Sequence, residues 1–201
     1  MNLLSDLQYF PSLIFYKYSF EYSNLIFEQY ESYQKMSYRN RCAIAGANGI
    51  ITLSVPLANG RNQKTLMKDV KIDGSKWQAQ HWKSIVSCYN KSPWFEFYKD
   101  ELVDLFTKNF TFLMDWDLAC FEWTLKKLKL SARISLTESF EEKPSEGIID
   151  LRNKILPKNY TDFESIRYRQ VFEDKIGFKP NLSILDLLFC EGNGASEKLK
   201  S

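Results

Sequence analysis

The chain has 201 residues, 26% of them charged in mixed sign, and its net charge of +2 at pH 7 gives no electrostatic case for nucleic acid as the main partner. Its 44% hydrophobic and 15% aromatic residues are enough to bury one well-packed core. No apolar run reaches the length of a membrane span, and the N-terminal residues lack the basic start of a secretion signal, so we expect a cytoplasmic protein.

The first thirty residues predict a strand from Leu3 to Gln8, a helix from Pro11 to Phe20 and a second strand at Leu25 to Phe27. A strand, a helix and a strand in close succession indicate a right-handed βαβ unit with parallel strands. The turn after the first strand then faces the sheet edge at which open α/β sheets bind ligands. Tyr9, in that turn, is a candidate ligand contact, and hydrophobic packing is the alternative.

The stretch from Cys42 to Val55 predicts a β-hairpin, because two apolar runs flank a turn that contains Asn48-Gly49. Arg39, Asn40 and Arg41 lie at the mouth of its first strand. A pair of guanidinium groups can hold a phosphate or carboxylate in fixed geometry, and an asparagine can orient a sugar hydroxyl. The alternative is that both arginines are solvated charges at a sheet edge.

The helix expected from about Ser75 to Tyr89 contains His81, the single histidine of the chain. A third short β segment is predicted before it, at Leu66 to Ile72. Histidine acid–base catalysis in this protein would have to use His81, since no other side chain has an unperturbed pKa near neutrality. The alternative is a half-buried imidazole packed between tryptophans and satisfied by one hydrogen bond.

Two more helices, from Ser92 to Thr107 and from about Asp115 to Leu128, are expected to cover the sheet, and Ala132 to Thr137 to extend it as a strand. Residues 138–168 are charged and rich in helix breakers, so we expect an irregular linker. An extended piece is predicted at Gln170 to Phe172.

A last apolar helix is expected after Ser183, which would cap it with support from Asp186. Asn181 precedes this helix and has no capping duty, so it is a candidate for binding a ligand or for holding Arg41 in place. Residues 193–201 are predicted to be a flexible tail. The fold class expected is α/β, a single domain over residues 1–192 with a mostly parallel Rossmann-like sheet, an added β-hairpin and covering helices.

No metal site or cofactor is identified from the sequence. The four cysteines form no Cys-x-x-Cys pair, and with one histidine a structural zinc site is not expected. The cysteines are expected to be reduced thiols that fill core space. Cys42 is a conceivable nucleophile, but its apolar neighbours indicate that it points into packing.

Several stretches, in their order and spacing, resemble the WbqC-like family of bacterial proteins, in the shorter version found in Bacteroidetes. They are Gln8–Pro11, Arg39–Arg41, Asn48–Gly49, Ser54–Pro56, Trp77 with His81–Trp82, Tyr89, Ser92–Phe95, Gln170–Phe172 and Gly177–Phe178 with Asn181–Leu188. Asn40, Arg41, His81, Asn181 and Asp186 stand at matching positions. The resemblance implies an association with O-antigen and surface-polysaccharide genes, and acyl or aminoacyl transfer to an amino sugar.

Two functions follow as hypotheses. In the first, the protein is a transferase acting on a nucleotide- or lipid-linked amino sugar, with His81 as general base, Arg39 and Arg41 on a phosphate or carboxylate, and Asn40 on a hydroxyl. In the second, the same cleft holds a sugar or nucleotide without chemistry, as an accessory protein. The expected partner in both is a small anionic or sugar ligand, and the oligomeric state stays open.

Overall fold

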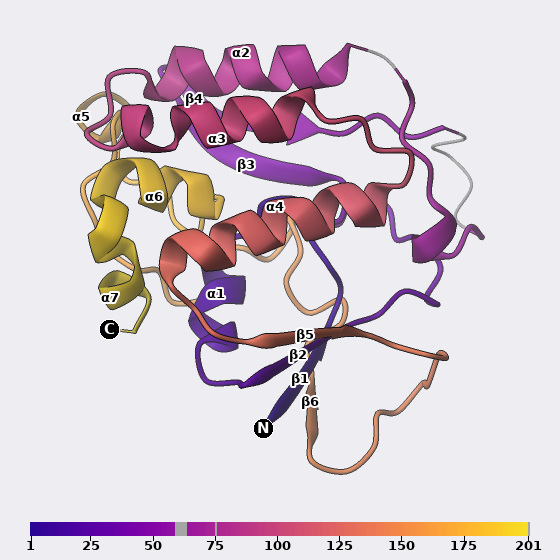
Figure 1. Cartoon of the computed structure of the whole chain (residues 1–201). Helices are drawn as coiled ribbons and strands as arrows, with labels where there is room; N and C mark the ends of the chain where they lie inside the picture. Colours follow the sequence, from indigo (N-terminus) through magenta and orange to yellow (C-terminus); the bar gives the residue numbers. More distant parts are fainter. Residues whose placement is uncertain (59–63, 75, 201) are drawn as a thin grey trace.

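The computed structural model describes residues 1–58, 64–74 and 76–200. Its main sheet has four parallel strands in the order β5-β2-β1-β6 (Figure 1). The strands are β1 (Asn2–Ser5), β2 (Asn24–Phe27), β5 (Arg133–Leu136) and β6 (Ile148–Asp150). The helix α1 (Leu13–Ser19) joins β1 to β2 and confirms the βαβ start.

The predicted hairpin is also confirmed, as a separate two-stranded antiparallel sheet of β3 (Arg41–Gly46) and β4 (Gly49–Ser54). Gly49 has a φ of 136°, a value that side-chain-bearing residues rarely adopt, so the turn depends on this glycine. The α/β fold class with an added hairpin is therefore the one that the sequence predicts.

Helices cover the sheet and the hairpin. In Figure 1, α2 and α3 lie over the hairpin, α4 lies between them and the main sheet, and α6 and α7 lie at one side. Their bounds are α2 (Trp77–Tyr89), α3 (Phe95–Thr107), α4 (Leu113–Leu128), α5 (Glu173–Ile176), α6 (Ile184–Glu191) and α7 (Ala195–Lys200). The expected start of α2 at Ser75 lies outside the described residues.

Aromatic rings of α4 form the centre of the core. Phe121 meets Phe27 of β2 edge-to-face, with ring centroids 5.0 Å apart, and meets Phe15 of α1 at 5.7 Å. Such pairs contribute about 0.5–1.5 kcal/mol each beyond the area that they bury. These contacts fix α4 against the βαβ unit, and so fix the position of everything that α4 carries.

Three segments differ from the sequence-based expectation. Residues 66–72 form a short 3₁₀ helix (Met67–Asp69) and isolated bridges instead of a strand, because Leu66 and Ile72 pair with different partners, Ser32 and Leu57. The supposed linker contains β6, which completes the sheet beside β1. After Gln170, the chain forms the short helix α5.

The segment beyond residue 192 also differs from the expected frayed tail. It forms the 3₁₀ turn Gly192–Gly194 and then α7, in which Ala195 and Leu199 are buried. Two apolar side chains four positions apart share one helix face, and this face packs on α1. None of the helices in the described residues has both the length and the apolar character needed to cross a membrane.

Candidate functional site

Two adjoining pockets form a groove beside the hairpin, and both are lined by Met36 and Arg41. The inner pocket, of about 240 Å³, is lined by Met36, Tyr38, Arg41, Cys42, Ala43, Ile50, Thr52, Pro157, Tyr160, Asn181 and Leu182. The outer pocket, of about 440 Å³, is lined by Tyr33, Lys35, Met36, Asn40, Arg41, Val55, Pro56 and Leu57. Together they have the size typical of a small-molecule site.

Arg41 is the charged residue at the centre of the groove. Its Nη1 atom contacts the Met36 sulfur at 3.6 Å, its Nε atom is buried without a hydrogen-bond partner, and within the described residues no carboxylate forms an ion pair with it. Lys35 adds a second cation to the outer pocket, and no Asp or Glu is among the lining residues. The groove therefore favours an anion.

Asn181 is in the lining of the inner pocket and has a fixed, buried hydrogen-bond acceptor. Its side-chain Nδ2 donates to the carbonyl oxygens of Tyr160 and Phe163 at 2.8 and 3.2 Å, which assigns the other end of the amide as Oδ1. Oδ1 has no partner in the described structure, although the residue is only 2% exposed. A buried acceptor without a donor is costly, and a ligand donor would remove that cost.

The other reactive side chains of the inner pocket are held in their neutral forms. Burial raises the pKa of Tyr38 to about 12, so this hydroxyl keeps its proton at neutral pH. Burial also raises the pKa of the Cys42 thiol, and Asp117 raises it further, so a thiolate nucleophile is disfavoured there.

Arg39 lies elsewhere, inside the protein at 1% exposure. Its guanidinium donates to Glu31 at 2.7 Å and to the Asn153 side-chain oxygen at 3.0 Å, and it lies 4.0 Å from the carboxylate of Asp6. Asn40 lines the outer pocket, but its side chain accepts from the Tyr33 hydroxyl and donates to a backbone carbonyl. The structure thus brings Arg41, Asn40 and Asn181 to one groove and places Arg39 in the core.

At the carboxyl edge of the parallel sheet, where we expected a ligand, two carboxylates have partners within the protein. Asp6 follows β1 and accepts from the backbone N–H of Asn153, while Glu28 follows β2 and pairs with Arg152 at 3.2 Å. These carboxylates have arginine and amide partners, and the pocket of about 250 Å³ beside this edge has Glu28, Glu138 and Glu141 in its lining, which disfavours an anion there. Within the described residues, no three His, Cys, Asp or Glu side chains are grouped as metal ligands.

His81 and Tyr9 form a buried pair. The Tyr9 hydroxyl lies 3.0 Å from His81 Nδ1, and Trp77 packs edge-on against the imidazole at 5.1 Å. His81 is 6% exposed, and desolvation lowers its pKa to about 4 despite an opposing hydrogen bond to the backbone of Ser54. Burial raises the pKa of Tyr9 well above its usual range, so its hydroxyl can donate to a neutral imidazole.

The hairpin separates this pair from the groove. Successive side chains of a strand point to opposite faces. Leu53 is buried in the core, whereas Ala43 and Thr52, paired with each other at the alternate positions, line the groove. Neither Tyr9 nor His81 is among the described residues that line the two pockets. A general base must reach the proton that it abstracts. The position of His81 favours the structural alternative, a packed and hydrogen-bonded core histidine.

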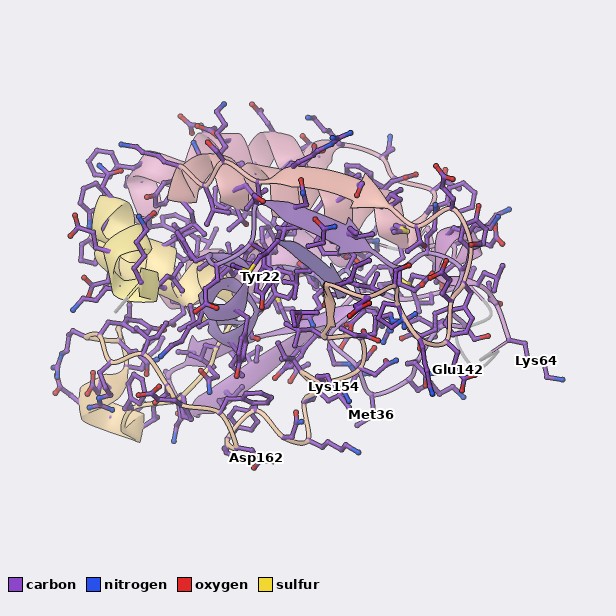
Figure 2. All side chains as sticks on the ribbon, turned by 90° about the horizontal axis from the view of Figure 1, so that it is seen from below. Tyr22, Met36, Lys64, Glu142, Lys154 and Asp162 are labelled. Atoms are coloured by element: carbon purple, nitrogen blue, oxygen red, sulfur yellow. The ribbon has the colours of Figure 1, made fainter. Side chains whose placement is uncertain are left out.

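Lys35, Met36 and Tyr160 are groove residues that sequence reasoning missed. Met36 is 65% exposed with a φ of 56°, an uncommon backbone conformation for a residue with a side chain. Figure 2 shows it at the lower rim of the molecule in that view. Lys35 and Met36 precede the two arginines by only a few positions, so a cationic cluster was visible, but Tyr160 comes from a distant segment.

The fold and the groove define an α/β protein with a cationic groove beside an added hairpin. A model of the WbqC-like protein family matches residues 7–162, and the chain belongs to that family, which confirms the resemblance. The uncharacterized protein Rv1507c of Mycobacterium tuberculosis (strain ATCC 25618 / H37Rv) is 24% identical to it over 197 residues, with 84% of each chain covered. Among solved structures, none matches the chain.

Proposed function

We propose that this WbqC-like protein binds an anionic sugar in the groove and transfers an acyl or aminoacyl group to an amino sugar in bacterial surface-polysaccharide or O-antigen biosynthesis. The observation that carries the proposal is the meeting of two pockets at Arg41, a cation without a carboxylate partner in the described residues. A transferase needs neighbouring places for a donor and an acceptor, and these pockets share two lining residues.

The groove residues have distinct roles in this proposal. Arg41, with Lys35, binds the phosphate or carboxylate of the ligand. Asn181 accepts a hydrogen bond from an N–H or O–H group of the same ligand. In the transfer step, the amine nitrogen of the sugar attacks the acyl carbon of an activated donor. The new N–C bond forms, the bond to the donor's leaving group breaks, and the amine proton passes to the leaving group or to solvent.

Arg39 and His81, which the sequence also singled out for binding or catalysis, have a supporting role in this proposal. Arg39, which precedes the hairpin, is held by Glu31, and His81 forms a hydrogen bond with the backbone of Ser54 at the end of the hairpin. Their contribution to function is to keep β3 in place, and with it Arg41.

Binding of glucose 1-phosphate, measured by isothermal titration calorimetry, tests the anion site. We expect Arg41→Gln to weaken binding at least tenfold and to reduce its dependence on salt, while uncharged glucose binds poorly to both forms. Arg133→Gln is the matched control, since Arg133 is exposed on the edge strand β5. Equal affinities of the wild type and Arg41→Gln would overturn the proposal.

The competing function is a sugar-binding accessory protein without chemistry, which the buried position of His81 favours. Incubation of the protein with glucosamine 1-phosphate and acetyl-coenzyme A, or an aminoacyl-tRNA mixture, distinguishes the two. A transferase produces the N-acylated sugar phosphate by mass spectrometry, and Arg41→Gln slows its formation. Arg41-dependent binding without product from either donor would favour the accessory function.

A further inference from the structure

We infer that the inner pocket is built for an uncharged hydrogen-bond donor, so that the ligand is a sugar phosphate whose amine is neutral or acylated, and an ammonium is rejected. This inference rests on the proposed function, because it assumes that an anionic sugar occupies the groove. It adds which charge state of the sugar nitrogen the site accepts.

The acceptor that would receive this donor is unusually well fixed. Asn181 has a φ of 53°, a left-handed conformation in which asparagine is favoured among non-glycine residues. Both carbonyl contacts of its Nδ2 come from one neighbouring segment, so the amide cannot turn without losing them. Oδ1 is therefore held as an acceptor, and an amide N–H or a hydroxyl of the ligand could complete it after a small adjustment of the surrounding side chains.

The charge around this acceptor is unfavourable for a cation. An ammonium has three donors and a full positive charge, but the described lining of the inner pocket has no carboxylate and includes the guanidinium of Arg41. Two like charges held close together at a protein surface repel each other. Deprotonation or acylation of the sugar nitrogen removes its charge, and with it this repulsion, and leaves at least one N–H donor.

The rest of the inner pocket suits a short acyl group. Ala43, Ile50, Pro157 and Leu182 provide apolar lining next to Asn181, while the anionic group would lie toward Lys35 in the outer pocket. Arg41 lines both pockets and would contact the ligand between its two ends.

The same electrostatics bears on the transfer step. An amine can attack an acyl carbon only with its lone pair free, and a cationic surrounding lowers the pKa of a bound amine. The sugar amine would then enter in its neutral form, and its proton would have been left to solvent. No histidine base is then needed to deprotonate an ammonium, and the N–H proton that is lost on acylation passes to the leaving group or to solvent.

Calorimetry with two probes that differ only at the nitrogen tests the inference. At pH 7, N-acetylglucosamine 1-phosphate is expected to bind at least tenfold more tightly than glucosamine 1-phosphate. Between pH 7 and pH 9, the amine probe is expected to gain affinity as its ammonium loses a proton, while the acetylated probe stays unchanged, since the phosphate is already dianionic above its second pKa of about 6.

Two variants distinguish the possible failures. Arg41→Gln should weaken the acetylated probe and shrink the ratio between the probes, and Asn181→Asp, which adds a carboxylate, should reverse the preference toward the ammonium. Circular dichroism checks that both variants fold. If Asn181→Asp does not fold, the Arg41 variant alone suffices for the test. Arg41-dependent binding with equal affinities for both probes would overturn this inference and leave the proposed function standing; binding indifferent to Arg41 would overturn both.

Discussion

Arg39 and Arg41 are two positions apart in the sequence, yet their surroundings differ completely. Arg39 is enclosed with Glu31, Asp6 and Asn153, whereas Arg41 faces a groove without acidic lining in the described residues. The sequence could not separate them, because the partners of Arg39 are Glu31, eight positions away, and Asn153, 114 positions away. The sequence placed both arginines in the candidate site, and the structure brings Arg41 to the groove and Arg39 to the core.

This difference predicts opposite phenotypes for the same substitution. Arg39→Met leaves the buried carboxylate of Asp6 and the partly buried carboxylate of Glu31 without their cation and should cost roughly 3–5 kcal/mol of unfolding free energy. Arg41→Met should change stability by no more than about 0.5 kcal/mol, because no ion pair is broken. Urea unfolding of both variants measures this, and equal losses would show that Arg41 also has a structural duty.

His81 gives a prediction in pH. Its pKa is about 4 when folded against 6.5 ordinarily, so the unfolded chain binds the proton more readily. Stability should therefore be complete above about pH 6.5 and fall as the pH is lowered toward 4, by about 3 kcal/mol over that window. Unfolding free energies of the wild type and His81→Gln at matched pH values isolate this term, since all carboxylates are common to both.

A solvent-facing histidine would behave differently in that experiment. Its pKa would stay near the ordinary value in both states, and the two stability curves would run parallel. Parallel curves would therefore restore the general-base hypothesis that the sequence raised for His81.

Among the elements, those with a clear local pattern were predictable, and those that depend on a distant partner were not. Alternating or helically spaced apolar residues predict the hairpin, α2, α4 and α6, and all four are present. The strand β6 has three residues inside a charged segment, and only its pairing with β1 makes it a strand. A local pattern cannot report a partner that lies 146 positions away, as Asn2 and Ile148 do.

The helix α6 shows how an expected local role became a long-range one. Ser183 does cap it, accepting from the Leu185 N–H at 3.4 Å and donating to the Phe10 carbonyl at 2.9 Å. Asp186, expected to support that cap, is instead buried between the hydroxyls of Tyr89 and Tyr168, at 2.5 and 2.6 Å. It therefore ties α6 to α2 and to the segment before α5.

Substitutions in α6 should reflect these two roles. Ser183→Ala is expected to cost about 1 kcal/mol, the usual loss of an N-cap. Asp186→Ala should cost more, roughly 3 kcal/mol, because two buried hydroxyls lose their acceptor. Asp186→Asn keeps an acceptor in place and should fall between them. Thermal melts rank the three variants, and a larger loss for Ser183→Ala would assign Asp186 a minor role.

For the molecule as a whole, the sequence predicts the βαβ start and a later strand that extends the sheet, but it does not predict the contacts of the C-terminal segment. The βαβ start places β1 and β2 side by side, and the helix-rich middle returns the chain to β5. The C-terminal reversal depends on Gly192, whose φ is 55° and whose absent side chain leaves room for the ring of Trp94, since a Cβ there would lie 2.0 Å from it. That approach is tertiary and has no signature in the sequence.

The position of α7 gives the last prediction. Leu199 is 1% exposed, α7 packs on α1, and the Lys200 ammonium lies 5.6 Å from the ring centroid of Phe20. Leu199→Ala should therefore lower the unfolding free energy by about 2–5 kcal/mol, as in other cores. Glu197→Gln, on the exposed face of the same helix, should change it by a few tenths. A flexible tail would make both variants indistinguishable from the wild type in urea unfolding, and a loss confined to Leu199 would place the end of the domain beyond residue 192.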